Sequence, residues 1–336
     1  MDLRKGLLGV ADRIEGLASR LPEPIRRPLL AEFRPLKELF LVRRAPRLLL
    51  VGAGADEVER LVRLVAGDPL ALGAWEDRPG WLLLRGKAES EEGIGLLPVG
   101  IDQPGLVREA LGNGRPDAVL VLSTHEQLVG VLEAVARFLA DPAQDAVPVE
   151  RCHVVVADRP VSGLSGESML QAQTVLRHSV AKVVLWGSEV FERSTVEFAE
   201  KLCDGLPAEC RLAFVRAADV PAARRRLARS VVRSITAVSA AIGAQPIPLA
   251  DLPVLASLQA LMVAAVMDIS GRRADLKSGS EFLASTGMNI GVAYALREGA
   301  RAVVKVVPGF GNAISGGVAA AGTYAIGRAA IAYFID

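Results

Sequence analysis

The chain has 336 residues, which is long for a single hydrophobic core and suggests two domains. Apolar residues make up 51% of it and charged residues 23%, the composition of a folded protein. The formal net charge is only +1, which gives no electrostatic reason to expect nucleic-acid binding. Three cysteines, with Cys203 and Cys210 the closest pair, provide neither a disulfide framework nor a zinc site and indicate a reducing, intracellular setting.

The first 46 residues contain two amphipathic helical patterns. In 1–21 apolar residues recur at helical spacing between charged ones, and a Pro-rich turn at 21–24 ends the pattern. A second pattern covers 26–43 and stops before Pro46. Charges every few residues near the N-terminus argue against a secretory signal, so we expect a cytoplasmic protein. Such helices can lie on a membrane surface, but packing against the next domain is the commoner use and is favoured.

From 47 to 216 short apolar runs alternate with helical patterns, as in a mostly parallel, doubly wound α/β sheet covered by helices on both faces. The runs that predict strands are 47–52, 80–86, 94–101, 117–122, 152–157, 182–186 and 210–215. The segments with helical periodicity are 56–66, 125–140, 166–179 and 189–204. We expect the first strand to be central, and ligands of such sheets bind at the carboxyl ends of the strands.

The first apolar run ends at Gly52 and passes through Gly54 into a helical pattern, which is the framework on which phosphate-binding loops are built. In the pattern G-x-x-x-x-G-K-[ST], backbone N–H groups cradle phosphate, the Lys reaches its outer oxygens and the hydroxyl holds Mg²⁺. When the first glycines are aligned, the second Gly, the Lys and the Ser/Thr are replaced by Glu57, Val58 and Glu59. The framework is present without the residues that carry its chemistry.

Two carboxylates, those of Asp56 and Glu57, stand at the start of the predicted helix, where they complement free N–H groups and the positive end of the dipole. The chain thereby places its own anion where phosphate would bind. Like charges about 4 Å apart repel by roughly 4 kcal/mol at an effective dielectric of about 20. The alternative interpretation is an ordinary strand–helix unit with an acidic N-cap.

The later nucleotide motifs are also incomplete. Asp102 and Gly105 form a D-x-x-G, in which a GTPase Asp orders the Mg²⁺ shell and the Gly N–H senses the γ-phosphate, although Pro-Gly turns are common. Where a base-reading N-K-x-D would stand, residues 157–160 are Ala-Asp-Arg-Pro. Trp-Gly-Ser at 186–188 replaces an S-A-K-like loop, and no Thr occurs before Thr124 to serve as the switch residue.

The order of these elements, with residues 21–26 and 43–47 ahead of the strand and glycine turn, resembles the Era/YcjF-type bacterial GTPases. In these a G domain precedes an apolar helical domain of unknown function. The C-terminal half carries the more specific matches, which are 246–253, Gln259, 308–312, 322–327 and 333–334.

The resemblance covers nearly the whole chain. It implies N-terminal helices over 1–46, a degenerate P-loop GTPase-like α/β domain over 47–216 and an apolar all-α domain over 217–336. It makes four glycine and aspartate positions vestigial parts of a nucleotide site: Gly52, Gly54, Asp102 and Gly105.

Between 221 and 336 no strand pattern is convincing, and apolar helices are predicted at 221–243, 252–268, 279–305 and 311–335. Of three charge-free stretches only 306–327 is long enough to cross a membrane, and its Gly and Ala content makes it modestly hydrophobic. Three interpretations stay open for it: a buried helix of a compact bundle, which is favoured, an integral span, or a reversible membrane attachment.

Small residues recur every four positions along 311–335 in two rows, one from Ala313 to Ala329 and one from Ser315 to Gly327. Such rows let another helix approach closely. We therefore expect a tight helix contact, within the domain or across a dimer. We also expect Gly317→Leu to destabilise the fold or dissociate an oligomer by overpacking.

Candidate sites elsewhere lack supporting residues. A basic run at 224–226, with Arg229 and Arg233, fits a solvated helix face, and a phosphate or lipid headgroup partner is the alternative. Gly-Leu-Ser-Gly at 163–166 falls one residue short of a nucleophile elbow. No metal or triad pattern joins the three histidines, which are His125, His153 and His178. We expect no catalytic residue, no metal and no cofactor.

Two functional hypotheses follow. In the favoured one the protein is a non-catalytic GTPase-like scaffold or interaction protein, a pseudo-GTPase without the P-loop lysine and the Mg²⁺-binding hydroxyl. Its helical domain would serve protein partners, self-association or contact with the cytoplasmic face of the inner membrane. In the alternative it is a divergent GTP-binding protein or GTPase that takes the missing cation from elsewhere, such as an Arg of a partner subunit. Nucleotide binding with and without Mg²⁺ distinguishes the two.

Overall fold

The structure is a computed structural model that describes residues 3–19, 22–52, 55–66, 75–78, 81–85, 93–100, 116–140, 149–192, 195–218, 221–244, 252–272, 274–285 and 311–336. The chain divides into two compact units. The α/β unit is Arg44–Ala223, and the helical unit combines Met1–Arg43 with Arg224–Asp336. The N-terminal helices, which the sequence sets apart as a segment of their own, therefore belong to one unit with the C-terminal helices.

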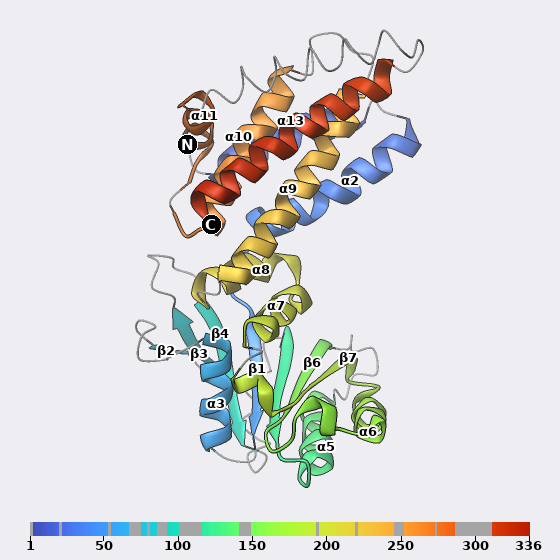
Figure 1. The fold of residues 1–336 in the computed structure, drawn as a ribbon, viewed down its shortest axis with the longest axis vertical. Helices are drawn as coiled ribbons and strands as arrows, with labels where there is room; N and C mark the ends of the chain where they lie inside the picture. Colours follow the sequence, from blue (N-terminus) through green and yellow to red (C-terminus); the bar gives the residue numbers. More distant parts are fainter. Residues whose placement is uncertain are drawn as a thin grey trace. The chain divides into compact units, whose positions relative to one another are not determined.

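Seven strands form one sheet in the order β2-β3-β4-β1-β5-β6-β7 (Figure 1). The strands are β1 Arg47–Gly52, β2 Trp75–Arg78, β3 Trp81–Arg85, β4 Gly93–Gly100, β5 Ala118–Ser123, β6 Val149–Val156 and β7 Val180–Trp186. The five strands from β4 to β7 in this order are parallel, whereas β2 and β3 add an antiparallel edge. The predictions of a mostly parallel sheet and of a central first strand are confirmed.

Helices cover both faces of this sheet, which is why its central strands are apolar along their whole length. On one face α5 (Leu128–Leu139) and α6 (Gly166–Leu176) share a core with alternate strand residues such as Leu49, Val121 and Val154. On the other face α3 (Ala55–Ala66) contacts β1 and β5, and α7 (Thr195–Gly205) contacts β6. Phe198 of α7 packs there against His153.

One predicted strand is wrong. The apolar run 210–215 lies inside a helix, α8, which spans Ala208–Ala217. Nearly every residue of the run is buried, so hydrophobic periodicity does not distinguish a buried strand from a buried helix there. The decisive signals are Pro207 at the N-cap position and Glu209 in the first turn, both of which favour a helix start.

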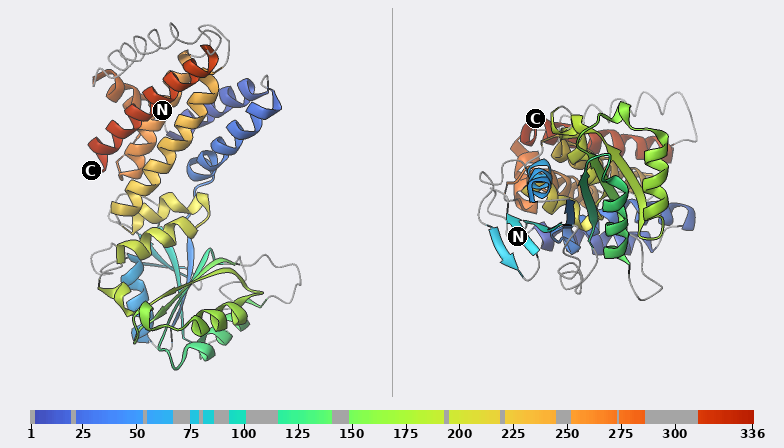
Figure 2. Two further views of the ribbon diagram at one scale, coloured as in Figure 1. Left: turned by 45° about the vertical axis from the view of Figure 1, so that its right-hand side comes forward. Right: turned by 90° about the horizontal axis from the view of Figure 1, so that it is seen from below.

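The helical unit is built around α10 (Leu252–Ile269), which contacts α1 (Leu3–Ala18), α11 (Leu276–Ser285) and α13 (Gly311–Phe334) (Figure 2). The other helices are α2 (Glu23–Lys37), which continues as the π-helical turn η1 (Glu38–Val42), and α9 (Pro221–Gly243). The helix predicted at 279–305 starts at Leu276, and its residues beyond 285 lie outside the described ones. Among the described residues, no helix has both the length and the apolar character needed to span a bilayer.

Polar contacts join the N-terminal helices to the C-terminal ones. Arg43 forms an ion pair with Asp268 at 3.0 Å, and both side chains are largely buried. The Ser234 hydroxyl on α9 donates to the Glu32 carboxylate on α2 at 3.0 Å. These bonds connect residues about two hundred positions apart in the sequence.

The expected tight helix contact of α13 occurs within the helical unit. A Cβ placed on Gly327 would lie 2.5 Å from a γ-carbon of Val232, and one on Gly316 would lie 2.8 Å from the Ala240 carbonyl oxygen, so α9 and α13 approach closely at both points. Gly317, in contrast, faces open space. The expectation that Gly317→Leu overpacks a helix contact within the domain is therefore wrong, because that row of small residues is on the exposed side of α13, and a contact across a dimer stays a prediction.

Candidate functional site: the carboxyl edge of the sheet

The strand order creates a topological switch point between β1 and β5. These strands are neighbours, but the chain leaves β1 towards β4 and leaves β5 towards β6. Open α/β sheets bind ligands in the crevice at such a point, outside the carboxyl ends of the strands. Gly52 is at this edge, buried and paired with Leu122. The other three predicted site positions, Gly54, Asp102 and Gly105, lie outside the described residues.

The first turns of α3 carry the residues that replace the phosphate-binding motif. Glu57 is half-buried at the helix start, and Glu59 forms an ion pair with Arg63 one turn further on at 2.6 Å. Arg60 places its guanidinium carbon 4.2 Å from the ring centre of Phe191. The two arginines that could substitute for the P-loop lysine thus already have partners, and Glu59 has its charge compensated along the helix.

The loops that follow β5 and β6 are tied together by hydrogen bonds that backbone N–H groups donate. The His125 N–H donates to Asp158 Oδ1 at 2.8 Å, and the Ala157 N–H donates to the Ser123 carbonyl at 2.9 Å. Asp158 follows the strand after which a base-reading carboxylate would be expected. It instead accepts a hydrogen bond from the neighbouring loop of the protein itself.

The loops that follow β6 and β7 are joined even more closely. The Ser188 N–H donates to the Arg159 carbonyl at 2.7 Å, and the Val161 N–H donates to both oxygens of the Glu189 carboxylate at 3.0 and 3.1 Å. Gly187 lies so close that an added Cβ would be 2.1 Å from the Val161 nitrogen. In a GTPase these two loops hold the base between them, whereas here they make direct contact.

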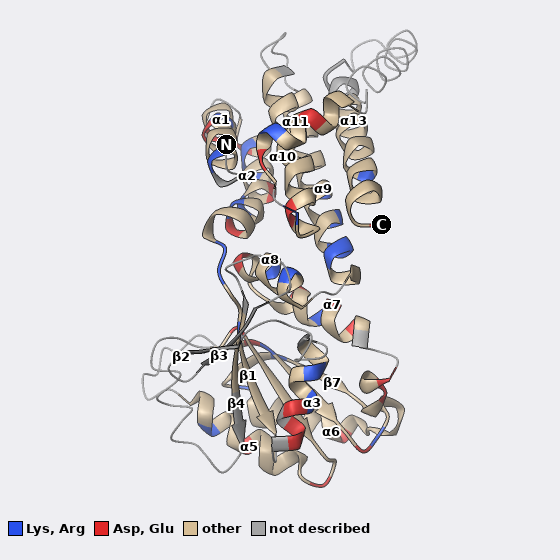
Figure 3. Cartoon of the chain, turned by 90° about the vertical axis from the view of Figure 1, so that its left-hand side faces the viewer, with Lys and Arg blue, Asp and Glu red and all other residues tan. Residues whose placement is uncertain are grey.

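The described part of this edge is also acidic. Asp56 and Glu126 are exposed at the ends of the β1 and β5 connections, and Glu192 is exposed after β7. Acidic residues on α3 are visible in Figure 3. Arg159 is an exposed cation on the same edge. Phosphate binding needs the opposite balance, with N–H groups and cations directed at the anion.

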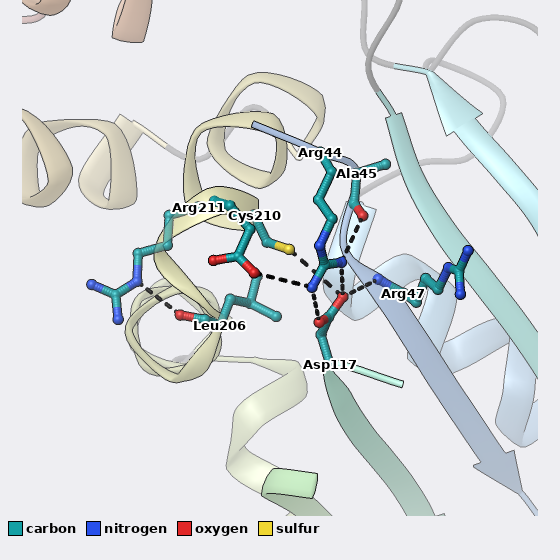
Figure 4. Close-up of polar contacts among 8 residues, drawn as sticks. Arg44, Ala45, Arg47, Asp117, Leu206, Cys210 and Arg211 are labelled. Carbon is teal, nitrogen blue, oxygen red and sulfur yellow. Dashed lines mark hydrogen bonds and ion pairs between the residues drawn. The ribbon is translucent and has the colours of Figure 1, made fainter. Parts of the chain in front are cut away.

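At the amino edge of the sheet, a polar cluster around the buried Asp117 carboxylate fastens three segments together (Figure 4). Asp117 accepts two hydrogen bonds from the Arg44 guanidinium at 2.6 and 2.7 Å and one from the Arg47 N–H at 2.8 Å. This pairing raises the pKa of Arg44, and burial, assisted by Asp117, raises the pKa of the Cys210 thiol. Cys210 is therefore a protonated, buried side chain, and the cluster is suited to structure rather than to nucleophilic chemistry.

His153 is buried between β6 and α7, and its environment keeps it neutral. Burial, with smaller effects from Arg151 and Lys201, lowers its pKa from 6.5 to about 3. The Trp186 indole N–H donates to its Nδ1 at 3.2 Å, which leaves the proton on Nε2. His125 and His178 are elsewhere in the unit, and within the described residues no group of His, Cys, Asp or Glu is placed to hold a metal ion.

Comparison of the chain with protein-family models finds no matching family, and comparison with curated proteins finds no match. What is established is therefore the class: a mostly parallel α/β unit combined with an all-helical unit. The GTPase resemblance of the sequence remains a proposal.

Proposed function

We propose that the α/β unit is a degenerate G domain that does not bind nucleotide, and that the protein is a non-catalytic scaffold that presents fixed surfaces to protein partners. Three features support kinship with G domains: the central first strand, the glycine at its carboxyl end and the helix that follows directly. They are what the resemblance to Era/YcjF-type GTPases implies. They concern the backbone arrangement around the site and not the side chains that bind phosphate and Mg²⁺.

The observation that carries the proposal is the direct contact between the loops after β6 and β7. A guanine ring needs a gap between these loops, but Gly187 leaves no room for even a methyl group against Val161. Opening the gap would break the hydrogen bond from the Ser188 N–H to the Arg159 carbonyl and the one from the Val161 N–H to the Glu189 carboxylate. The bond to the charged Glu189 contributes about 1.5–3 kcal/mol and the backbone bond about 0.5–1.5 kcal/mol, so nucleotide entry would begin with a penalty of this size.

The residues at the position of the phosphate-binding loop also argue against nucleotide binding. Replacing the lysine by Val58 removes a charge-assisted bond worth about 1.5–3 kcal/mol, and Glu57 adds repulsion at the helix start. Glu59 repels phosphate less than its position alone would suggest, because its charge is compensated by the ion pair with Arg63. Because each 1.4 kcal/mol is about tenfold in affinity, a micromolar ancestral site would become millimolar or weaker.

A domain of this kind does not switch. GTPase loops become ordered when they contact the γ-phosphate and relax on hydrolysis. In this protein the loops after β5, β6 and β7 are held by hydrogen bonds to one another. The edge is then a constant, acidic surface, which suits a permanent interaction role.

Calorimetric titration of the full chain with GTP and Mg²⁺ tests the proposal. We expect no measurable binding up to about 1 mM, and the same result with ATP. The matched variant is Glu57→Gly, Val58→Lys, Glu59→Ser, which restores the phosphate-binding pattern and leaves the base-side loops joined. Any binding by this variant should therefore show no preference for guanine. Micromolar, Mg²⁺-dependent GTP binding by the unmodified protein would establish the divergent GTPase instead.

A further inference from the structure

The two units have opposite net charges, although the whole chain is almost neutral. The helical unit contains 21 Lys and Arg against 12 Asp and Glu, which gives +9, and the α/β unit contains 18 against 26, which gives −8. Together they make the +1 of the chain. Charge asymmetry of this size between parts of a chain indicates an electrostatic partner for one of them.

Within the helical unit six acidic residues have basic partners, and three exposed arginines without an ion pair to a described residue lie on two neighbouring helices. Acidic residues with basic partners are Glu15, Glu23, Glu38, Asp268, Glu281 and Asp336. Arg229 and Arg233 on α9 and Arg328 on α13 are exposed, and none forms an ion pair with a residue that the structure describes. These three side chains therefore present part of the excess positive charge to solvent.

The three arginines belong to one outer face of a helix pair. α9 and α13 are antiparallel neighbours, joined by the ion pair of Arg225 with Asp336 at 2.6 Å and by the contact of Gly327 with Val232. Arg229 and Arg233 are one helical turn apart on either side of Val232 in the sequence, and Arg328 directly follows Gly327. Figure 3 shows basic residues on both helices.

The remaining residues on this side of α13 are small or aromatic. Gly317, Ala321 and Ala325 are exposed, and their small side chains project little from the helix surface. Tyr324 is 45% exposed on this side, whereas Tyr333 is on the opposite side of α13 and packs against Phe282 of α11. Arginine forks match phosphate groups, and tyrosine combines an apolar ring with a polar hydroxyl, so both are favoured where a protein meets lipid headgroups.

We propose that this outer face of α9 and α13, called the α9–α13 face, docks on an anionic lipid surface. A two-fold contact between copies through the same face would oppose arginine to arginine, and a nucleic-acid backbone would leave Tyr324 and the small apolar residues without a role. The contact is with the headgroup region, where basic side chains meet anionic groups. The inference concerns the helical unit and does not depend on the nucleotide site.

Flotation of the full chain with vesicles tests this docking. Vesicles of phosphatidylcholine with a third phosphatidylglycerol should carry the protein at low salt, and vesicles of phosphatidylcholine alone should not. A basic residue near an anionic surface changes partition by about fivefold, which corresponds to about 1 kcal/mol. The triple variant Arg229→Gln, Arg233→Gln, Arg328→Gln should therefore lower partition about a hundredfold.

Arg137→Gln is a control variant, because Arg137 is an exposed arginine on α5 in the α/β unit and its loss should leave partition unchanged. Melting curves of all variants should coincide, so that lost flotation is not lost folding. Three results would overturn the docking: no partition into anionic vesicles, equal partition of the triple variant and the parent, or binding to duplex DNA with none to vesicles. A dimer that dissociates in the triple variant would also overturn it by assigning the face to a second copy.

Discussion

The glycines of α13 allow a sharp test of how the helical unit is held together. Gly327 and Gly317 are both interior residues of the same helix, but only Gly327 is packed against a neighbour. A methyl group on Gly327 would lie 2.5 and 2.7 Å from the two γ-carbons of Val232 and 3.0 Å from the sulfur of Met262. Carbon atoms pack comfortably at about 3.5–4.0 Å, so the overlap with Val232 is about 1 Å.

The two neighbours differ in how well they can yield. Met262 is flexible and can move its sulfur, whereas a valine in a helix has one strongly preferred rotamer. Relief therefore requires α9 and α13 to separate, which is the usual overpacking cost of about 1–3 kcal/mol. Replacing glycine by alanine in a helix also gains about 0.5–1 kcal/mol. Gly317→Ala should show this gain alone, so the difference between the two variants isolates the steric cost.

Denaturant unfolding of both variants measures this difference. Trp75, Trp81 and Trp186 all belong to the α/β unit, so tryptophan fluorescence follows that unit and far-UV circular dichroism adds the helical one. We expect Gly327→Ala to lower the circular-dichroism transition relative to Gly317→Ala by about 1–3 kcal/mol. Val232→Ala should cost less in the Gly327→Ala background than in the parent. The packing argument fails if Gly327→Ala is as stable as Gly317→Ala, or if Val232→Ala costs the same in both backgrounds.

Three further predictions concern the α/β unit. Gly187→Ala should destabilise it by about 1–3 kcal/mol in fluorescence-monitored unfolding, because the added methyl group meets the rigid backbone at Val161. The control is Gly163→Ala, whose added methyl group would have its nearest contact at 3.7 Å, and it should be neutral within about 0.5 kcal/mol. His153 binds a proton in the unfolded chain below pH 6.5 but in the folded chain only near pH 3. Its contribution to the free energy of unfolding is therefore complete above pH 6.5 and falls by up to about 1.4 kcal/mol per pH unit below that value. Unfolding between pH 6.5 and 4 should depend less steeply on pH in His153→Phe, and an unchanged slope would assign the acid sensitivity to other groups. Asp117→Asn should cost about 1.5–3 kcal/mol through the weakened Arg44 bonds, and a cost below about 0.5 kcal/mol would show that the cluster adds little.

The sheet could be predicted from the sequence where burial dictates an unbroken apolar run. The runs 47–52 and 117–122 agree with β1 and β5 to within a residue, because strands covered on both faces leave no place for polar residues. The edge strand β2 could not be found this way. Its sequence, Trp-Glu-Asp-Arg, has three charged residues out of four and no alternation, and charged residues are common on edge strands.

The candidate site shows a different limit of sequence analysis. The loss of the P-loop residues is visible in the sequence, because the missing groups are side chains. The contact between the loops after β6 and β7 is not visible, since Gly187 gives no sign of which backbone lies against it. Likewise the two small-residue rows of α13 have the same spacing, and only Val232 on another helix decides which row is buried.

The division of the chain has a consequence for the order in which its parts fold. The two parts of the helical unit are separated in sequence by the 180 residues of Arg44–Ala223. At about 5–20 residues per second, synthesis of this segment takes roughly 10–40 s. During that time α1 and α2 have been made but their partners on α9 and α10 have not, so the apolar stripes of both helices need protection.

Prior folding of the α/β unit makes the later closure easier. The Arg44 N–H donates to the Glu209 carbonyl at 3.0 Å. In the folded unit the first residue, Arg44, is therefore next to α8, which is only a few helical turns before the last residue, Ala223. Shortening the open loop from 180 residues to about 14 lowers its closure entropy by about 2 kcal/mol. The cluster around Asp117 thereby holds the two ends of the α/β unit close together. Its loss should slow assembly of the helical unit, although the cluster is not part of that unit.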